Sequence, residues 1–297
     1  MSTLAWQADV ERLLGAAGPA RWMQRGPSGW GETWSLQIGA ARYFVKTATG
    51  RYAPMLEAEA DGLRALAATD TIRVPRVVAN VRCDATGALA LEWLEMRSRR
   101  NGADLGRALA AQHQAAVPCG SGNGRFGWGR DNWIGGTPQK NGWDSEWPRF
   151  FRDCRLAPLF ALAEKNGHGG ALQRDGERLL AALPGLLRGH EPAPSLLHGD
   201  LWSGNAAALA NGEPVIFDPA VYVGDRECDL AMTELFGGFD ADFYAAYNEA
   251  WPLDAGYPVR RKLYNLYHLL NHLNLFGAGY LAQVEQTIGA LHAETRF

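Results

Sequence analysis

The spacing of apolar residues over the first 95 positions predicts strands on either side of one long helix. Helical spacing over residues 5–15 is followed by two apolar runs around glycine turns in RGPSGWGETWSLQIGAARYFVK, a pattern typical of paired strands. Helical spacing returns in PMLEAEADGLRALAA, where Pro54 lies in the expected first turn. Two or three more strands are expected in VPRVVANVRCDATGALALEW. This part of the chain is therefore predicted to form a small α+β unit.

From Asp104 onward the pattern becomes mainly helical. Helical apolar spacing is found in DLGRALAAQHQAA, in EWPRFFRDCRLAPLFALAEKNG and in ALQRDGERLLAALPGLL. The exception lies between Leu196 and Phe217, where LLHGDL and PVIFD are short apolar strands around polar loops. We predict an α+β, bilobal fold, with a nucleotide-binding lobe over residues 1–95 and a larger helical lobe over residues 96–297. The lobes are expected to join near residues 92–102, with the hinge at 92–96.

Composition narrows the class of protein. Hydrophobic residues make up 47% and charged residues 21% of the 297 positions, as in ordinary globular proteins. The formal net charge of −3 does not favour nucleic acid or anionic membranes as partners. No apolar run approaches the ~20 residues that a membrane-spanning helix needs. The cysteines are scattered, without CxxC spacing: Cys83, Cys119, Cys154 and Cys228. We expect a reduced, cytoplasmic protein.

Polar groups interrupt the apolar stretch around HGDLWSGN. Asp200 and Asn205 are five positions apart, as in the H-x-D-L-x-x-x-N catalytic loop of kinases, and Asp218 follows the apolar strand PVIF thirteen residues later. Phosphoryl transfer needs one carboxylate to orient the acceptor hydroxyl, and a second carboxylate with an amide oxygen to hold Mg²⁺ on the phosphates. We predict that Asp200 is the base and that Asn205 and Asp218 bind the metal. His198 is expected to brace the loop.

A lysine at the end of a strand completes this pattern. Lys46 follows the apolar run RYFV and is expected to contact the α and β phosphates of ATP. Its ion-pair partner should be a glutamate on the following helix. Glu59 shares a helical face with Leu63 and Leu66, whereas Glu57 lies on a charged face, so Glu59 is the predicted partner.

Two further segments are candidates for nucleotide binding. In PSGWGETW, Gly29 and Gly31 would let the backbone approach the phosphates, although the third glycine of a G-x-G-x-x-G loop is missing. In LALEWLEM, backbone groups around Glu92 and Leu94 are expected to hydrogen-bond adenine at the hinge. Each feature is weak alone, and the prediction depends on all of them occurring in this order.

A second acidic cluster, GDRECDL, leaves two interpretations open. Asp229 precedes a helical run, so it is expected to cap that helix or to brace amides of the catalytic loop. Asp225 and Arg226 follow a glycine, and we consider them for contact with the substrate or for ordering of the loop.

The stretch FGWGRDNWIGGTPQKNGWDSEW combines aromatic, amide and acidic residues between glycines. Asp131 and Trp133 are candidate substrate contacts, as is Trp202 in the catalytic loop; alternatively, the tryptophans only fix a long loop to the helical lobe. His268 and His272 have a spacing that zinc sites use, but the glutamate of HExxH is absent and the helix is otherwise apolar. We interpret these two histidines as structural.

The chain resembles the fructosamine kinase (ketosamine-3-kinase) family in LLHGDLWSGN, in PVIFDPAVYVGDRECDLAMTELFGGF and in LYNLYHLLNHLNLFG. The similarity runs from about residue 5 to the C-terminus and includes MLEAEADGL and ALALEWLEM. That family is related to aminoglycoside phosphotransferases and choline kinases and shares the bilobal protein-kinase-like fold. The resemblance implies ATP-dependent phosphorylation of the sugar O3 of ketoamines, which are glycation products, in a deglycation repair reaction.

The resemblance implies the same site residues: Asp200 as base, Asn205 and Asp218 at the metal, Lys46 paired with Glu59. Pro219 follows Asp218 where regulated protein kinases have Phe-Gly, which suggests a constitutively assembled site. Trp30 occupies the glycine loop, which has no cysteine, so redox control through that loop is not expected.

Two other functions are considered. A kinase of the same fold could act on an aminoglycoside or on choline, which would favour an acid-lined pocket. A nucleotide-binding pseudokinase would lack a catalytic group, and here none is missing. The expected partners are small ketoamines or glycated protein lysines, and the expected assembly is a monomer or a weak homodimer.

Overall fold

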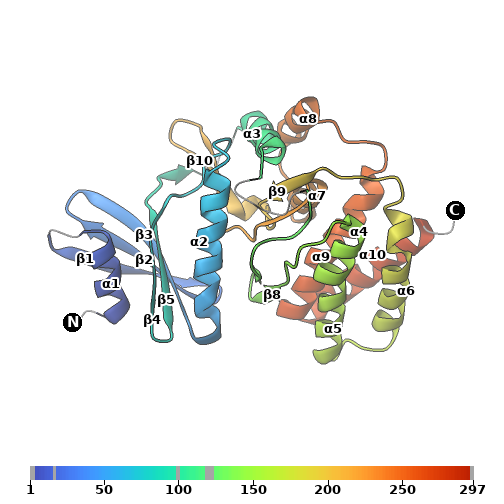
Figure 1. Cartoon of the computed structure of the whole chain (residues 1–297), viewed down its shortest axis with the longest axis horizontal. Helices are drawn as coiled ribbons and strands as arrows, with labels where there is room; N and C mark the ends of the chain where they lie inside the picture. Colours follow the sequence, from blue (N-terminus) through green and yellow to red (C-terminus); the bar gives the residue numbers. More distant parts are fainter. Residues whose placement is uncertain (1–3, 16–17, 98–100, 118–123, 295–297) are drawn as a thin grey trace.

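The computed structural model describes residues 4–15, 18–97, 101–117 and 124–294. Cys119 lies outside these ranges. Two parts lie side by side along the longest axis of the molecule, with the N-terminal sheet at one end and the C-terminal helices at the other (Figure 1). Within the described residues, no helix is both long and apolar enough to cross a membrane.

The N-terminal part is a five-stranded antiparallel sheet in the order β1-β2-β3-β5-β4, with one helix on each face. Its elements are α1 (Ala5–Leu13), β1 (Ala20–Ser28), β2 (Gly31–Ile38), β3 (Ala41–Thr49), α2 (Ala53–Ala67), β4 (Val77–Cys83) and β5 (Thr86–Glu92). A short 3-10 turn, Gly50–Tyr52, leads into α2.

Alternation along β5 explains how the sheet holds both helices. Ala88 and Ala90 belong to the apolar cluster that includes Trp6 of α1, whereas Leu89 and Leu91 pack in the cluster of α2. Successive side chains of a strand point to opposite faces, so one strand serves both layers. Helix α2 is thereby fixed beside β3, the strand that carries the predicted lysine.

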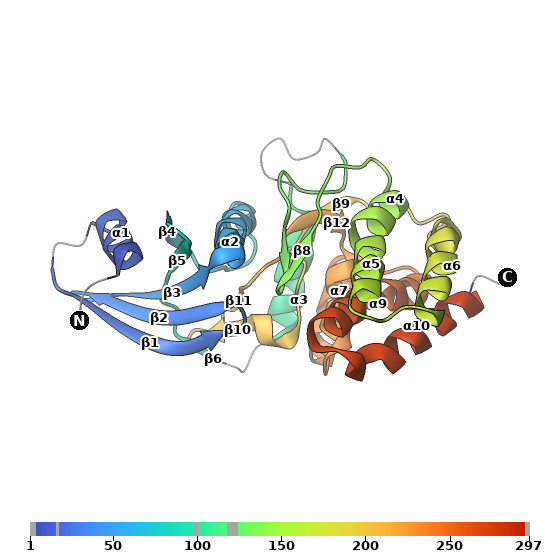
Figure 2. The same cartoon turned by 90° about the horizontal axis from the view of Figure 1, so that it is seen from below.

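The C-terminal part is mainly helical, as expected. Its helices are α3 (Gly102–Gln114), α4 (Trp147–Phe151), α5 (Ala157–Lys165), α6 (Ala171–Leu186), α7 (Glu227–Leu235), α8 (Ala241–Ala250), α9 (Tyr257–Phe276) and α10 (Leu281–Glu294). A π-helical turn, Arg152–Leu156, joins α4 to α5, and 3-10 turns lie at Ser203–Asn205 and Ala278–Tyr280. Helix α9 lies among α5, α7 and α10 (Figure 2), and eleven of its residues are buried.

Short strands frame the loops between these helices. They are β6 (Met96–Arg97), β7 (Asn132–Ile134), β8 (Thr137–Gln139), β9 (Pro194–Leu197), β10 (Ala206–Leu209), β11 (Pro214–Ile216) and β12 (Tyr222–Asp225). Strand β10 pairs with β11 and with β6, and β12 pairs with β9. The link between the two parts, expected near residues 92–102, thus includes a short strand, β6. The α+β, two-part architecture is confirmed.

Candidate active site

A buried lysine joins the two parts of the molecule. Lys46 of β3 places its Nζ 2.7 Å from Oε1 of Glu59 on α2 and 2.6 Å from Oδ1 of Asp218, which follows β11. Burial alone would lower the pKa of Lys46, but the charges of Asp218 and Glu59 raise it above its ordinary value. The ammonium group is therefore charged and held between two carboxylates. The helical-face argument selected the glutamate that makes this pair.

Close backbone packing brings Glu59 to this position. A Cβ added to Gly62 of α2 would lie 3.0 Å from Val221 and 3.5 Å from the Pro219 ring, so α2 lies directly on the segment after Asp218. Asp218 itself has a φ of 60°, in the left-handed region that few non-glycine residues adopt. Such a conformation persists only where the surroundings fix it, and here Lys46 holds the carboxylate of Asp218 while Gly62 of α2 packs on the following residue, Pro219.

Asp200 lies in the loop between β9 and β10, next to the predicted metal ligands. Asn205 donates from Nδ2 to the backbone oxygen of Asp200 at 2.8 Å, and the same nitrogen lies 3.4 Å from its carboxylate. Burial, together with the charges of Asp218 and Asp229, raises the pKa of Asp200 to about 7. A base is most efficient when its pKa lies near the working pH, so this carboxylate suits proton transfer from an alcohol.

Asp229 holds the backbone of the predicted catalytic loop. Its two carboxylate oxygens accept hydrogen bonds from the amides of His198 (2.7 Å) and Gly199 (2.8 Å). His113 of α3 donates from Nε2 to the same group at 3.1 Å, since a carboxylate can only accept. Asp229 lies within α7, so of the two interpretations the structure supports the brace on the loop amides, not the helix cap.

Replacing Asp229 by Asn is expected to lower the free energy of unfolding at neutral pH by about 3 kcal/mol, because its donors lose a charged acceptor. Burial would raise the pKa of Asp229, but His113 and the loop amides hold it below its ordinary 3.8. The contribution to stability is therefore complete above that pH and is lost on further acidification. Urea unfolding of both proteins should show a gap at neutral pH that narrows in acid. Equal stability at neutral pH would contradict the brace.

The glycine turn between β1 and β2 forms one wall of a cavity of about 280 Å³. Gly29 has a φ of 51°, and a Cβ on Gly31 would lie 1.8 Å from the backbone oxygen of Thr47. The close approach of Thr47 therefore requires glycine at position 31, and the left-handed backbone favours glycine at position 29. The same cavity is lined by Lys46, Asp200, Asn205 and Asp218, so the turn faces the predicted catalytic groups.

A second cavity of about 240 Å³ lies at the predicted hinge. It is lined by Phe44, Lys46, Pro75, Leu91, Glu92, Trp93, Leu94, Met96, Phe217 and Asp218. Glu92 is partly committed: its amide donates to Arg76 O at 3.0 Å, and its carboxylate accepts from Arg73 and from the Arg76 amide. The amide and side chain of Glu92 thus fix the strand to residues 73–76 and are not available to a ligand.

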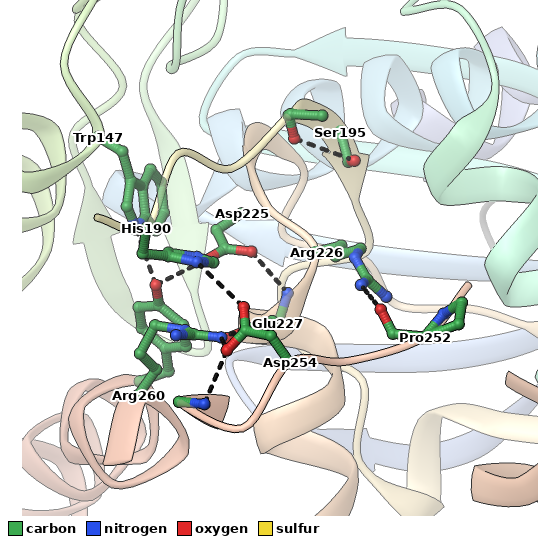
Figure 3. Close-up of polar contacts among 12 residues, drawn as sticks. Trp147, His190, Ser195, Asp225, Arg226, Glu227, Pro252, Asp254 and Arg260 are labelled. Carbon is green, nitrogen blue, oxygen red and sulfur yellow. Dashed lines mark hydrogen bonds and ion pairs between the residues drawn. The ribbon is translucent and has the colours of Figure 1, made fainter. Parts of the chain in front are cut away.

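The structure corrects the substrate role considered for Asp225 and Arg226. Asp225 is only 1% exposed and accepts hydrogen bonds from Tyr264 and His190, each at 2.6 Å (Figure 3). Arg226 donates to the backbone oxygens of Trp251 and Pro252. Asp225 pairs with Pro194 of β9, and neither Asp225 nor Arg226 lines the cavities that contain Lys46 or Asp200, which the sequence alone does not show.

His190, Asp225 and Glu227 come close enough together to be considered as a metal site among the described residues. However, Arg260 forms two hydrogen bonds of 2.7 Å with the carboxylate of Glu227, and both partners are buried (Figure 3). The guanidinium group of Arg260 already neutralises the carboxylate of Glu227, which a metal cation would need as a ligand. We therefore interpret the cluster as a structural network that attaches α9 to the start of α7.

The aromatic loop contributes in part to the cavities. Trp133 and Trp202 line the glycine-turn cavity, and Trp202 is 40% exposed. Asp131 does not line the described cavities; its carboxylate accepts from the amide of Asn141 at 2.8 Å and shapes the loop. Buried amides also fix this loop, since Asn132 donates to the backbone oxygen of Val221. The amide contacts support the interpretation that the loop is fixed to the helical part, and Trp133 and Trp202 stay candidate substrate contacts.

A third cavity, of about 410 Å³, adjoins Asp200 and was not predicted. Its lining is mostly aromatic and apolar: Ile134, Gly135, Asp200, Trp202, Met232, Phe236, Asn271, His272, Leu275, Phe276 and Tyr280. The His272 ring lies 4.7 Å from that of Phe236, 5.2 Å from Phe276 and 5.1 Å from Tyr280. The signal available in the sequence was Phe276, an aromatic residue at the end of an apolar helical run.

The two histidines of α9 do not form a zinc pair. Nδ1 of His272 donates to the backbone oxygen of His268 at 2.8 Å, as a carbonyl can only accept. Burial and the neighbouring His272 lower the pKa of His268 to about 3. His268 is buried in the helical part, in agreement with a structural interpretation, whereas His272 also lines the aromatic cavity.

Comparison with known proteins identifies the family. A sequence model described as fructosamine kinase matches residues 26–294. The chain belongs to the fructosamine kinase family. A probable ketoamine kinase from Synechocystis is 44% identical over 97% of both chains. A chloroplastic protein-ribulosamine 3-kinase from Arabidopsis thaliana is 43% identical, over 82% of this chain and 74% of its own.

Solved structures agree with this family and fold. A candidate fructosamine-3-kinase from Thermobifida fusca has a TM-score of 0.86 and 32% identity, covering 98% of this chain and all of its own. An aminoglycoside phosphotransferase, APH(4)-Ia, has a TM-score of 0.66 at 15% identity, over 99% of this chain and 98% of its own, which shows the shared fold alone. The family and the kinase-like fold predicted from the sequence are confirmed.

Proposed function

We propose that this fructosamine kinase family member transfers the γ-phosphoryl group of ATP to the sugar O3 of ketoamines. The observation that carries the proposal is the position of Asp200, which lines both the cavity at the glycine turn and the aromatic cavity. A base in that position reaches a hydroxyl on one side and a phosphate on the other. Curated relatives described as ketoamine and ribulosamine kinases support this acceptor.

In the reaction, the oxygen of the acceptor hydroxyl bonds to the γ-phosphorus, and the Asp200 carboxylate takes the proton of that hydroxyl. The bond to the bridging oxygen breaks, and ADP leaves. Lys46, fixed by Glu59, binds the α and β phosphates, and the backbone of the turn at Gly29 and Gly31 covers them. The hinge cavity accepts adenine, with backbone groups at Leu94 as the remaining polar candidates.

Asn205 and Asp218 fit a magnesium ion by their chemistry. Because Nδ2 of Asn205 is committed to the backbone oxygen of Asp200, its Oδ1 is left as a ligand, and the side chain of Asp218 is 44% exposed. Amide and carboxylate oxygens are the ligands that hard cations prefer. When bound there, the ion would neutralise charge on the phosphates.

The third cavity is proposed to hold the acceptor. Trp202, Phe236 and Phe276 offer ring faces to a sugar or a protonated amine, and the catalytic aspartate supplies the carboxylate in the lining. This composition supports a ketoamine over a polycationic aminoglycoside, which would need more acid. Small ketoamines and glycated lysines in the cytoplasm remain the proposed substrates.

The test is magnesium-dependent ADP release with fructoselysine, ribuloselysine, kanamycin, choline or no acceptor. We expect turnover on the ketoamines alone, with ³¹P NMR placing the phosphate on O3. Turnover only on kanamycin or choline would replace the substrate but keep the fold. ATP binding without turnover on any acceptor would argue for a pseudokinase.

A further inference from the structure

One aromatic residue of the glycine turn contacts the other half of the molecule. Trp30 lies between Gly29 and Gly31, and its ring lies against the turn between β7 and β8. A Cβ added to Gly136 in that turn would lie 2.3 Å from Cε2 and 2.4 Å from Cζ2 of the Trp30 ring. Real Cβ atoms do not approach this closely, so the ring fits only because residue 136 has no side chain.

The Trp30 ring also contacts the segment that leads into α2. It stacks on Tyr52, with ring centroids 5.2 Å apart and an interplanar angle of 28°. Tyr52 is the residue directly before α2, the helix that carries Glu59. The indole is therefore packed between the start of α2 and the β7–β8 turn, and moving the ring would disturb both.

The β7–β8 turn also reaches the proposed acceptor cavity. Gly135 lines that cavity together with Ile134, and it also lines the cavity at the glycine turn. A second contact comes from the same segment: Arg130 lies 2.6 Å from Asp61 and 3.3 Å from Glu57 on the charged face of α2. Residues 130–136 thus contact the glycine turn and helix α2, and they line the proposed acceptor cavity.

We infer that Trp30 is a positioning residue that couples acceptor binding to nucleotide binding through its contact with Gly136. An acceptor beside Ile134 and Gly135 stabilises the β7–β8 turn, which holds the indole and keeps the glycine turn over the phosphates. By linkage, ATP then favours acceptor binding by the same factor. The inference rests on the proposed function, because it needs a ketoamine that binds beside Asp200.

The test measures the Kd of Mg·AMP-PNP by titration calorimetry with and without fructoselysine. In the wild type, the acceptor is expected to lower that Kd about tenfold, and in Trp30→Ala and in Gly136→Ala less than about twofold. Both variants should raise KM for ATP and acceptor more than they lower kcat. Gly129→Ala is the matched control, because a Cβ there meets no atom within 4 Å, and it should retain the full coupling.

A double variant separates this contact from general damage. The three nearest atoms that a Cβ on Gly136 would meet all belong to the Trp30 ring. Adding Gly136→Ala to Trp30→Ala is therefore expected to change nothing further, a complete failure of additivity. Trp30→Phe retains an aromatic ring and is expected to keep most of the coupling, which guards against a folding defect in the alanine variant.

Wild-type coupling that persists in both single variants would overturn the inference, as would turnover on a ketoamine without any coupling in the wild type. Additive losses in the double variant would also overturn it. Absence of turnover on every ketoamine is a separate result: it refutes the proposed function, and this inference with it.

Discussion

Replacing Asp200 by Asn is expected to lower kcat by about three orders of magnitude, while the Kd of ATP stays within about twofold. The amide keeps the shape of the side chain, and the hydrogen bond from Asn205 to the backbone oxygen of residue 200 is retained. The amide cannot, however, accept the proton of the acceptor hydroxyl. Since Lys46 and the glycine turn are unchanged, nucleotide binding should survive. Steady-state kinetics with a ketoamine, together with ATP titration calorimetry, gives both numbers.

Asp242→Asn is a suitable control, because Asp242 is an exposed residue in the first turn of α8 and should leave kcat unchanged. Asp200→Asn with near wild-type kcat would remove this residue from the role of base. Loss of ATP binding would instead mean that Asp200 organises the nucleotide site.

Replacing Asp218 by Ala is expected to weaken the binding of ATP in the presence of magnesium about tenfold or more, since a charged ligand is lost. Binding of magnesium-free ATP should not weaken, because removal of a carboxylate also removes repulsion of the phosphates. Titration of ATP by calorimetry, once with magnesium and once with EDTA, measures the Kd under each condition.

Asp218→Asn serves as the comparison for this variant. Asn tolerates the left-handed backbone conformation with a φ of 60° and keeps an oxygen near Lys46, so it separates the loss of charge from a change of backbone. Equal losses for ATP with and without magnesium in Asp218→Ala would argue against a metal role.

The parts of the site that the sequence predicted well share one property: their geometry is set locally. Asp200 and Asn205 are five positions apart in one loop, and Glu59 and Leu63 are one helical turn apart, so spacing alone orients these side chains. The contact between Lys46 and Glu59 then required only that α2 pack on the sheet.

Other parts depend on long-range pairing and could not be predicted. Asp225 follows a glycine in a polar stretch, yet it lies in β12, which pairs with β9, and it is almost completely buried. The aromatic cavity brings Phe236 together with His272 and Tyr280 from separate elements, and apolar periodicity counts such residues as core. These residues come from segments far apart in the chain, and no short stretch of the sequence shows that they line one cavity.

The packing of Pro219, the residue after Asp218, on helix α2 has a consequence for inhibitor design. Many kinase ligands bind only when an aromatic residue after the metal-binding aspartate swings out and opens a pocket beside it. This chain has a proline there, packed against Gly62 of α2, so compounds that depend on such a pocket have nothing to occupy. Selective inhibitors would instead combine the hinge cavity with the indole at position 30, a surface absent from enzymes with a small residue in the glycine turn.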